Sequence, residues 1–407
     1  MNRKIPHSQP TYLRKDQWTL IYAEVDYDRA NKCFDMMEQA CRSFGMRVEE
    51  PFFCEVPDDL GRMRDGDGYI RHLNNFPFSD YKIAVVIIHD SRHKKKIKAH
   101  LDRKGIVSQF ILSSTIDRAK ITVYSNILKQ INAKCKEDLY RLKTDQKMQG
   151  TMVVGTDIVA AGRSAVIGLT ASYSSHLTQH YAQVVKQDLL NDLVGKKMTK
   201  DEQEEQVCKN RAEIIVNFTL NALNKYLKIN KTLPKQIAIY RDGVGGPSYQ
   251  EKVIRYESNM IEAAVRGVQQ NYDPKLIYCL VDKKINTRFV ERRGDNYANP
   301  APGTVVDSGL TEHASANGNG SFDFYMVAHR ATIATALPVH YFVVKNTTSM
   351  SPQEVETFTY HLCYNYFNFM GSIKVPGAVM YANKIANYAN DLGVLPSEAL
   401  ATNLHYL

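Results

Sequence analysis

The chain has 407 residues, enough for two or three domains, and its 44% hydrophobic and 23% charged residues exclude a disordered tail or a fibre. No run of 18 apolar residues is present, which excludes a transmembrane helix and leaves no membrane-spanning role. Lys and Arg number 52 against 43 Asp and Glu, and the formal net charge of +9 favours polyanions such as nucleic acid or an anionic membrane surface.

The first 140 residues alternate between predicted strands and helices. Apolar runs predict strands at 18–22, 83–88 and 109–112, and helical spacing predicts helices at 29–44 and 121–133. The run at 83–88 is apolar throughout, which is typical of a strand buried on both faces of a parallel sheet. A small α/β unit is therefore predicted here.

A second α/β unit is predicted to begin near residue 150. Three strands followed by alternating helices and strands indicate a mixed sheet with helices on both faces. A stretch rich in Asn, Gly and Pro at 296–320 predicts a loop. The predicted strands are 151–160, 165–173, 180–185, 236–241, 276–282, 323–329 and 340–345, and the predicted helices are 205–228, 249–266, 352–367 and 379–391.

The seven cysteines are scattered along the chain and form no CxxC pair. The first residues are basic, with no apolar stretch behind them, so we expect no secretory signal and reduced thiols. A cytoplasmic or nuclear location follows as an expectation. The histidines show no zinc-binding spacing, so no structural zinc site is expected.

A basic stretch at 89–104 contains seven Lys or Arg and is the first candidate site. It follows the predicted buried strand at 83–88 and leads into a helix. Ligands of open α/β sheets bind beyond the carboxyl ends of strands, and helix N-termini favour anions, so a phosphate site is expected at this turn. Lys134 and Lys136, which end the helix at 121–133, can reach the same place. The alternative is a solvated basic face.

Asp157 and Asp242 each stand at the end of a predicted buried strand. If those strands are neighbours, the two carboxylates lie side by side, an arrangement that binds divalent metal ions in phosphoryl transfer. The alternative is that each Asp caps a turn or a helix start. Arg241, beside Asp242, can also pair with a carboxylate.

Several segments, read together in their order and spacing, resemble the Piwi branch of the Argonaute family. They are IYRDGV (239–244), KKINTRF (283–289), PGTVVD (302–307), FDFYMVAH (322–329), LCYNYFN (362–368), VPGAVMYANKIA (375–386) and LHYL (404–407). The resemblance covers residues from about 15 to 407. It implies a Rossmann-like MID domain at 1–145 followed by a ribonuclease H-like PIWI domain at 146–407, and the family's N-terminal and PAZ domains have no counterpart in these residues.

The resemblance implies that the first unit grips the 5′-phosphate of a small guide RNA and that the second presents the guide to complementary target RNA. Gene silencing with partner proteins is the implied role. Lys94 or His93 stands where the family has a Tyr that stacks on the first base. The residues implied in phosphate binding are Lys94, Lys98, Gln109, Gln130 and Lys134.

The resemblance also implies a magnesium ion beside that phosphate. In the Piwi branch the C-terminal carboxylate can reach such an ion, and here the matching group is the carboxylate of Leu407.

The family's slicing members use two Asp, one Glu and a His or Asp around two magnesium ions. Asp157 and Asp242 match the first and third positions, whereas Asn210 occupies the Glu position and Asn383 the His position. Two uncharged ligands out of four leave little anionic charge to hold two ions, so guided binding without slicing is expected. The alternative is a magnesium-dependent endoribonuclease whose missing carboxylate comes from Glu204, Glu205 or Glu213.

Overall fold

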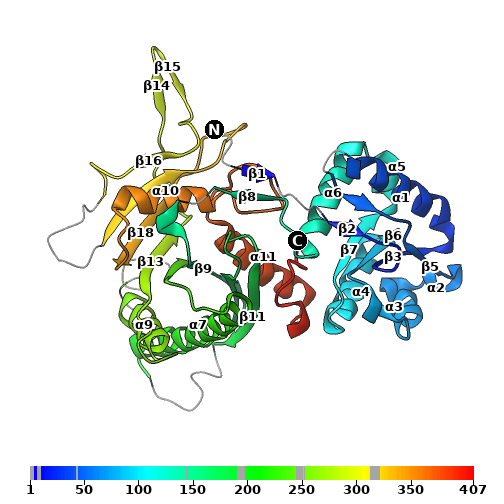
Figure 1. Cartoon of the computed structure of the whole chain (residues 1–407), viewed down its shortest axis with the longest axis horizontal. Helices are drawn as coiled ribbons and strands as arrows, with labels where there is room; N and C mark the ends of the chain where they lie inside the picture. Colours follow the sequence, from blue (N-terminus) through cyan, green and yellow to red (C-terminus); the bar gives the residue numbers. More distant parts are fainter. Residues whose placement is uncertain are drawn as a thin grey trace. The chain divides into compact units, whose positions relative to one another are not determined.

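In the computed structural model, the described residues are 4–6, 11–42, 45–143, 145–189, 198–243, 251, 253–311 and 321–407. They form two compact units, Met1–Arg141 with Tyr388–Leu407, and Leu142–Asn387 (Figure 1). The expected division at 145/146 lies close to the first boundary. At the other end of the chain, however, Tyr388–Leu407 packs with the first unit.

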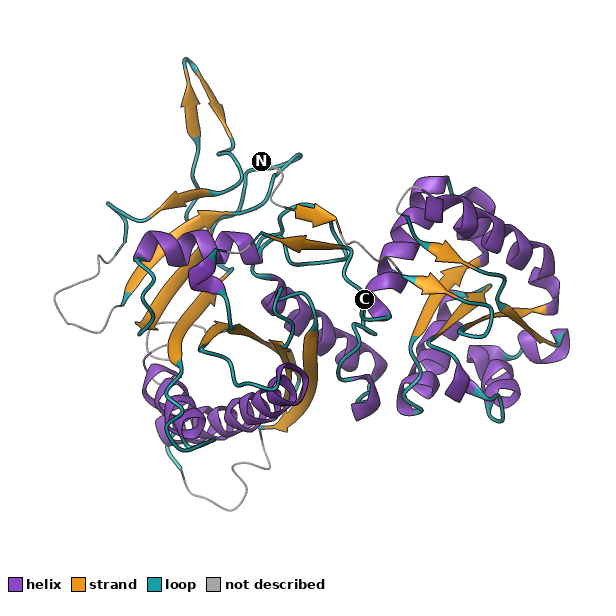
Figure 2. Ribbon diagram, in the orientation of Figure 1, coloured by secondary structure: helices purple, strands orange, loops and turns teal. Residues whose placement is uncertain are grey.

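The first unit contains a four-stranded sheet in which every strand is parallel to its neighbours. Its order is β5 (Phe52–Val56), β3 (Trp18–Ala23), β6 (Ile83–Ile88) and β7 (Ser108–Leu112). Helices flank this sheet (Figure 2). They are α1 (Tyr27–Cys41), α2 (Asp58–Gly61), α3 (Asp67–Leu73), α4 (Ser91–Arg103), α5 (Ser113–Arg118) and α6 (Ile121–Lys134), and short strands lie at β1 (Lys4–Pro6), β2 (Tyr12–Leu13), β4 (Arg47–Val48) and β8 (Tyr140–Leu142).

The central strand β6 is buried on both faces, as its apolar run predicts. Val85 and Ile87 belong to the core shared with α1 and α6, whereas Val86 and Ile88 belong to the core shared with α3 and α4. Successive side chains of a strand point to opposite faces, so a strand between two helical layers must be apolar at every position. The Rossmann-like expectation for this unit agrees with that arrangement.

The second unit contains an eight-stranded mixed sheet. Its first three strands are antiparallel, β9, β12 and β13 are parallel, and the remaining strands are antiparallel. The order is β11 (His180–Asp188), β10 (Ser164–Ser172), β9 (Thr151–Ala161), β12 (Gln236–Asp242), β13 (Lys275–Asp282), β18 (Val339–Asn346), β17 (Phe322–Val327) and β16 (Thr304–Val306).

Helices cover both faces of this sheet, and two adjacent residues of β12 show which helix lies where. The hydroxyl of Tyr240 is 2.8 Å from that of Thr359 on α10 (Pro352–Leu362). Arg241 points to the opposite face, where it pairs with Glu257 of the π-helical turn η7 (Ile254–Ser258). The helices α7 (Lys200–Asn230) and α9 (Asn259–Arg266) pack against η7, so they share the Arg241 face.

The helices begin where the sequence provides caps. Thr199 and Glu202 form a capping box at the start of α7, and Ser351 and Glu354 form another at the start of α10. Each box satisfies backbone N–H groups that have no partner within the helix. Within the described part of the chain, no helix is long and apolar enough to span a bilayer.

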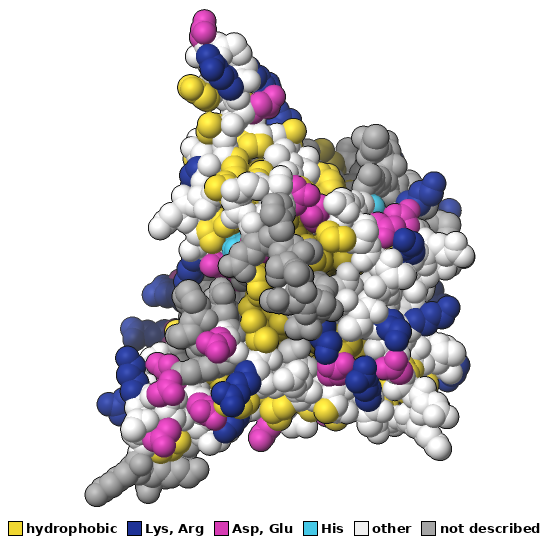
Figure 3. Space-filling model, turned by 90° about the vertical axis from the view of Figure 1, so that its left-hand side faces the viewer, with side chains coloured by type: hydrophobic (Ala, Val, Ile, Leu, Met, Phe, Trp, Pro, Cys, Tyr) yellow, Lys and Arg dark blue, Asp and Glu magenta, His cyan; other side chains and the backbone are white. Residues whose placement is uncertain are grey.

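The predicted loop at 296–320 is wrong in part. It contains β15 (Asn296–Ala298), which pairs with β14 (Glu291–Arg293), and β16, which pairs with the sheet. The β14–β15 hairpin projects from the second unit and exposes charges of both signs (Figures 1 and 3). Both strands have three residues, too few for an alternating pattern to be visible, and 312–320 lies outside the described residues.

Helix α11 (Gly377–Leu392) lies very close to β9 and β10 because two glycines face it. A Cβ at Gly155 would overlap the backbone of Ala378, and one at Gly168 would overlap the carbonyl oxygen of Ala382. Only glycine permits this approach of backbone to backbone. The approach brings Asn383, the residue after Ala382 on α11, to Asp157 of β9.

We therefore expect Gly168→Ala to lower the free energy of unfolding by about 1–3 kcal/mol, because the added methyl group must push α11 away from the sheet. Urea unfolding followed by circular dichroism measures this change. Gly267→Ala is the matched control, since a Cβ there meets Ala264 only at 3.4 Å, an ordinary contact. Equal losses in the two variants would contradict the close approach.

Candidate functional sites

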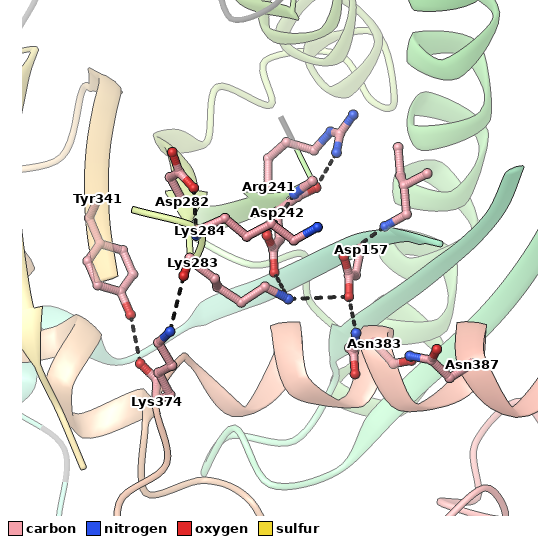
Figure 4. Close-up of polar contacts among 12 residues, drawn as sticks. Asp157, Arg241, Asp242, Asp282, Lys283, Lys284, Tyr341, Lys374, Asn383 and Asn387 are labelled. Carbon is pink, nitrogen blue, oxygen red and sulfur yellow. Dashed lines mark hydrogen bonds and ion pairs between the residues drawn. The ribbon is translucent and has the colours of Figure 1, made fainter. Parts of the chain in front are cut away.

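Asp157, inside β9, and Asp242, the last residue of β12, lie side by side on neighbouring strands (Figure 4). Strands β9 and β12 are parallel, and Thr156 pairs with Arg241 in their register, so the two aspartates are the next residues along. Both are buried, with 4% and 3% of their surface exposed. The condition that the sequence left open, that these two strands are neighbours, is met.

The ammonium group of Lys283 lies between the two carboxylates. Its Nζ contacts Oδ2 of Asp242 and lies 3.5 Å from Oδ2 of Asp157. Lys283 follows β13, the strand next to β12, so its side chain starts at the same edge of the sheet. Asn383 of α11 completes the cluster by donating its amide N–H to Oδ2 of Asp157.

The protonation behaviour of the cluster reflects the crowding of two carboxylates in a buried place. Burial, with the neighbouring charge of Asp157, raises the pKa of Asp242 to about 6. Partial burial alone would lower the pKa of Lys283, but the carboxylates of Asp242 and Asp157 outweigh it and raise that pKa above its ordinary value. The lysine therefore remains charged and stabilises the pair.

The cluster opens into a cavity of about 520 Å³. Two lysines and two asparagines bring hydrogen-bond donors to its wall, beside the carboxylates. Its lining consists of Asp157, Ile158, Val159, Ala160, Asp242, Gly243, Val281, Asp282, Lys283, Lys284, Asn383 and Asn387.

The residues at this cavity do not fit a pair of magnesium ions. An ion between Asp157 and Asp242 would need the position that the Lys283 ammonium takes. Over the described ranges, no group of three or more His, Cys, Asp or Glu side chains is arranged to hold a metal ion. Magnesium requires several oxygen ligands in near-octahedral geometry, and this cluster offers two carboxylates that an ammonium group already contacts.

Asn210 and the alternative glutamates are not brought to this cavity. Asn210 lies on α7, the helix on the Arg241 face, and its Oδ1 accepts a hydrogen bond of 2.8 Å from Gln206. Glu205 accepts a hydrogen bond of 2.6 Å from the Tyr256 hydroxyl and forms an ion pair with Lys209 at 2.7 Å. Among the described residues, neither these nor Glu204 and Glu213 line the cavity.

Arg241 forms the ion pair with a carboxylate that the sequence analysis considered, and its partner is Glu257. Its Nε donates to Glu257 at 2.8 Å, both side chains are fully buried, and the Tyr278 hydroxyl donates to the same carboxylate at 2.9 Å. The guanidinium also donates to the carbonyl oxygen of Asp242. This buried network fixes the backbone that carries Asp242.

Two buried lysines of the first unit converge on the start of β7. Lys98 Nζ donates to Ser108 Oγ at 2.9 Å, and Lys134 Nζ donates to the carbonyl oxygen of Ser108 at 3.0 Å. Each lysine has 2% of its surface exposed. Ser108 therefore brings together residues from α4 and α6, 36 positions apart in the chain.

Gln109 links this cluster to Gln130, another residue of α6. Its Oε1 accepts a hydrogen bond of 2.9 Å from Lys134, and its Nε2 donates one of 3.2 Å to Oε1 of Gln130. Lys94 is exposed on α4, one turn before Lys98, and its charge reaches both buried lysines. All five residues expected to bind phosphate thus lie in one region of the first unit.

The physical reason given above for a phosphate site at the turn before α4 is wrong. The N-terminus of α4 is capped by Asp90, whose side chain accepts from the backbone N–H of Arg92 at 2.9 Å and pairs with the Arg92 guanidinium. A carboxylate thus already occupies that helix end. The buried lysines gather instead at the amino end of β7, and Lys134 is the last residue of α6, where the helix dipole favours a cation.

The cluster carries more buried positive charge than the protein neutralises. Asp102 contacts Lys98 at 3.2 Å, and it is the one carboxylate in the described part of the chain that pairs with either lysine. Burial lowers the pKa of Lys98, and burial together with Lys98 and Lys94 lowers that of Lys134 well below its ordinary value. An anion bound here would raise both pKa values and stabilise the charged lysines.

The C-terminal residues of the chain border this cluster. Asn403 donates its amide N–H to the carbonyl oxygen of Lys134 at 2.9 Å. His405 is buried, and burial with the charges of Lys98 and Lys134 lowers its pKa to about 3. Leu407 follows two residues later and is half-buried.

No role was assigned in the sequence analysis to three residues of these two clusters, Lys283, Asp102 and His405. Lys283 appears there only within the KKINTRF segment, although a Lys just past a strand that neighbours β12 is a usable signal. Asp102 lies four residues after Lys98, a spacing that predicts an ion pair on a helix. His405 offers no such signal, because only the folded chain brings it to the lysines.

The lowered pKa of Lys134 predicts a dependence of stability on pH. Below pH 10.5 the unfolded chain holds this proton while the folded protein tends to release it, so the free energy of unfolding rises with pH in that window. We expect the free energy of unfolding to rise more steeply with pH, below pH 10.5, in the wild type than in Lys134→Gln, by at most about 1.4 kcal/mol per pH unit.

Urea unfolding of the ligand-free protein at several pH values tests this slope. Lys120→Gln is the control, since Lys120 is exposed at the other end of α6. Parallel curves for wild type and Lys134→Gln would show that the buried ammonium costs no stability.

Comparison with known proteins places these two units in a family. Residues 83–392 match the family model of the Piwi domain. The chain is 29% identical over 410 residues to Piwi-like protein 1 of Gallus gallus, covering 98% of this chain and 43% of that protein. It is 30% identical over 401 residues to protein argonaute-3 of Drosophila melanogaster, covering 96% and 42%. The chain thus spans less than half the length of these curated relatives.

Solved structures share the fold. The crystal structure of Drosophila Piwi matches with a TM-score of 0.79 at 22% identity, covering 97% of this chain and 51% of that one. The C-terminal lobe of a budding yeast Argonaute gives 0.77 at 19% identity, covering 99% and 86%. The expected fold class, a Rossmann-like unit followed by a ribonuclease H-like PIWI unit, is confirmed. Since the Piwi-domain model matches more than half of its residues, the chain belongs to the Piwi family.

Proposed function

We propose that this chain holds the 5′-phosphate of a small guide RNA in its first unit and presents the guide to complementary target RNA without cutting it. The observation that carries the proposal is the pair of buried lysines, Lys98 and Lys134, of which only Lys98 pairs with a carboxylate, Asp102, in the described part of the chain. An uncompensated buried charge costs several kcal/mol, so such a cluster is built for an anion.

A terminal phosphate suits this cluster better than an internal one. A phosphate monoester carries close to two negative charges near neutral pH, whereas a backbone diester carries one. Lys98 and Lys134 supply charge-assisted donors at the start of β7, and the amide of Gln109 lies beside Lys134. Lys94, exposed at the rim, adds charge for the neighbouring backbone.

Relatives with the same fold support a guide as the ligand. The Argonaute of Kluyveromyces polysporus, with a TM-score of 0.76 and 19% identity over 99% of this chain and 52% of that one, was solved with a guide RNA. Base pairing would supply sequence specificity, while the protein contacts the backbone and recognises A-form shape. Silencing would then depend on partner proteins recruited to the paired target.

The second unit supports binding without cutting. Lys283 contacts both Asp157 and Asp242, and Asn383 donates a hydrogen bond to Asp157. Asn210 lies on α7, at another face of the sheet. A two-metal site needs anionic ligands around both ions, which this cluster does not provide.

A magnesium ion beside the guide phosphate remains part of the proposal. The carboxylate of Leu407 would hold it, and His405 already lies close enough to Lys98 and Lys134 to sense their charges. The ion would add positive charge for the phosphate. Chelation with EDTA should then weaken binding of a 5′-phosphorylated guide more than binding of a 5′-hydroxyl guide.

We expect a 5′-phosphorylated RNA to bind more tightly than the same RNA with a 5′-hydroxyl, and Lys134→Met to remove most of that preference. A charge-assisted hydrogen bond contributes about 1.5–3 kcal/mol, so the loss should be about 10- to 100-fold. Fluorescence anisotropy at fixed salt measures both affinities. Lys120→Gln should keep the preference, and equal binding of the two RNAs by the wild type would refute a phosphate pocket.

We also expect no cleavage of an end-labelled, fully complementary RNA when the guide-loaded protein is given magnesium or manganese. The target should be retained on the protein but remain intact, because Lys283 neutralises the carboxylate pair. A single cut across from the guide that disappears in Asp157→Ala would establish slicing instead. Substitution of Glu204, Glu205 and Glu213 would then identify the third carboxylate.

A further inference from the structure

We infer that Lys283 is a built-in counter-ion that takes the place of a divalent metal at the Asp157–Asp242 pair, so that this site does not bind Mg²⁺ or Mn²⁺. The inference concerns the ligand-free protein and does not depend on guide binding. It assigns to one lysine the task of holding two buried carboxylates together.

Three of the four carboxylate oxygens of the pair accept hydrogen bonds from the protein, and the fourth contacts the Lys283 ammonium. In Asp157, Oδ1 accepts from the backbone N–H of Ile158 at 2.9 Å, and Oδ2 accepts from Asn383 and lies near Lys283. In Asp242, Oδ1 accepts from the backbone N–H of Gly243 at 2.7 Å, and Oδ2 contacts Lys283. A metal ion would have to displace these donors to gain a ligand.

The position of Lys283 is set by elements on both sides of it. Val281 pairs with Asp242 in the parallel register of β12 and β13, so Lys283 comes two residues after the point opposite Asp242. Its carbonyl oxygen accepts a hydrogen bond of 3.1 Å from Lys374, which fixes the backbone where the side chain turns toward the pair. The side chain is about a quarter exposed, with the ammonium group directed inward (Figure 4).

A tethered ammonium competes well with a free divalent ion. Because Lys283 is attached to the same sheet edge, its effective concentration at the pair is in the millimolar range or above. Magnesium must also lose tightly held water and find octahedral oxygen ligands. Asn383 donates its amide N–H to Asp157. The nitrogen of this amide therefore faces the carboxylate pair, and its oxygen, the atom that could bind a metal ion, does not.

Lys284 offers a matched control for Lys283. It lines the same cavity and carries the same charge, but it is exposed and makes no ion pair with Asp157 or Asp242 in the described part of the chain. Removing its charge changes the potential of the cavity without opening the carboxylate pair.

Binding of Mn²⁺ to the guide-free protein, followed by electron paramagnetic resonance of the free ion, tests the inference. The wild type and Asp157→Asn should bind the same amount of Mn²⁺, since the pair binds none. Lys283→Met should gain a Mn²⁺ site, and adding Asp157→Asn to it should abolish that gain. Lys284→Met should behave as the wild type.

Two results would overturn the inference. Weaker Mn²⁺ binding by Asp157→Asn than by the wild type would show that the metal displaces the ammonium. A folded Lys283→Met without a new Mn²⁺ site would show that the lysine is not what excludes the ion. The comparison of wild type with Asp157→Asn keeps the test decisive if Lys283→Met fails to fold, because Asp157→Asn retains the Lys283–Asp242 ion pair.

Discussion

The parallel pairing of β9 with β12 is the constraint on which the second unit depends. Once Thr156 is opposite Arg241, the next residues place two carboxylates together in a buried place. Two such charges repel each other strongly where water is excluded, so the fold must supply a cation or force a proton onto one of them. Lys283 supplies the cation, and the raised pKa of Asp242 shows that the compensation is incomplete.

The two clusters solve opposite problems of charge. The second unit has two buried carboxylates and brings its own ammonium group to them. The first unit has two buried ammonium groups, Lys98 and Lys134, and brings one carboxylate, Asp102. Each cluster keeps one charge that its own side chains do not balance, negative in the second unit and positive in the first. In the second unit Lys283 contacts both carboxylates, whereas in the first unit Asp102 pairs with Lys98 alone, so Lys134 gains most from a bound anion.

Backbone contacts decide how closely the helices can approach these clusters. Gly155 and Gly168 let α11 lie against β9 and β10, which carries Asn383 to Asp157. The fully buried pair of Arg241 and Glu257 fixes the strand end from the opposite face. The acidic pair is therefore held on both sides of the sheet, and its geometry is a property of the whole unit.

By itself the sequence determined the elements and the chemical types at their ends. Apolar runs such as 83–88 and 151–160 mark strands wherever both faces are buried, because such strands can carry no polar alternation. The aspartates of β9 and β12, and the lysines of α4 and α6, were therefore visible in advance. Short strands such as β14 and β15 were not, since three residues hold no readable period.

Only the tertiary structure decided which of these groups meet. Register and strand order put Asp157 beside Asp242, and the same order brought Lys283 from a third strand to neutralise them. The packing of α4 and α6 against β7 places Lys98 and Lys134, the lysines proposed to bind phosphate, at the amino end of that strand, away from the turn that local reasoning favoured. The physical reason is that charge compensation acts over a few ångströms in space, between residues whose separation along the chain carries no record of it.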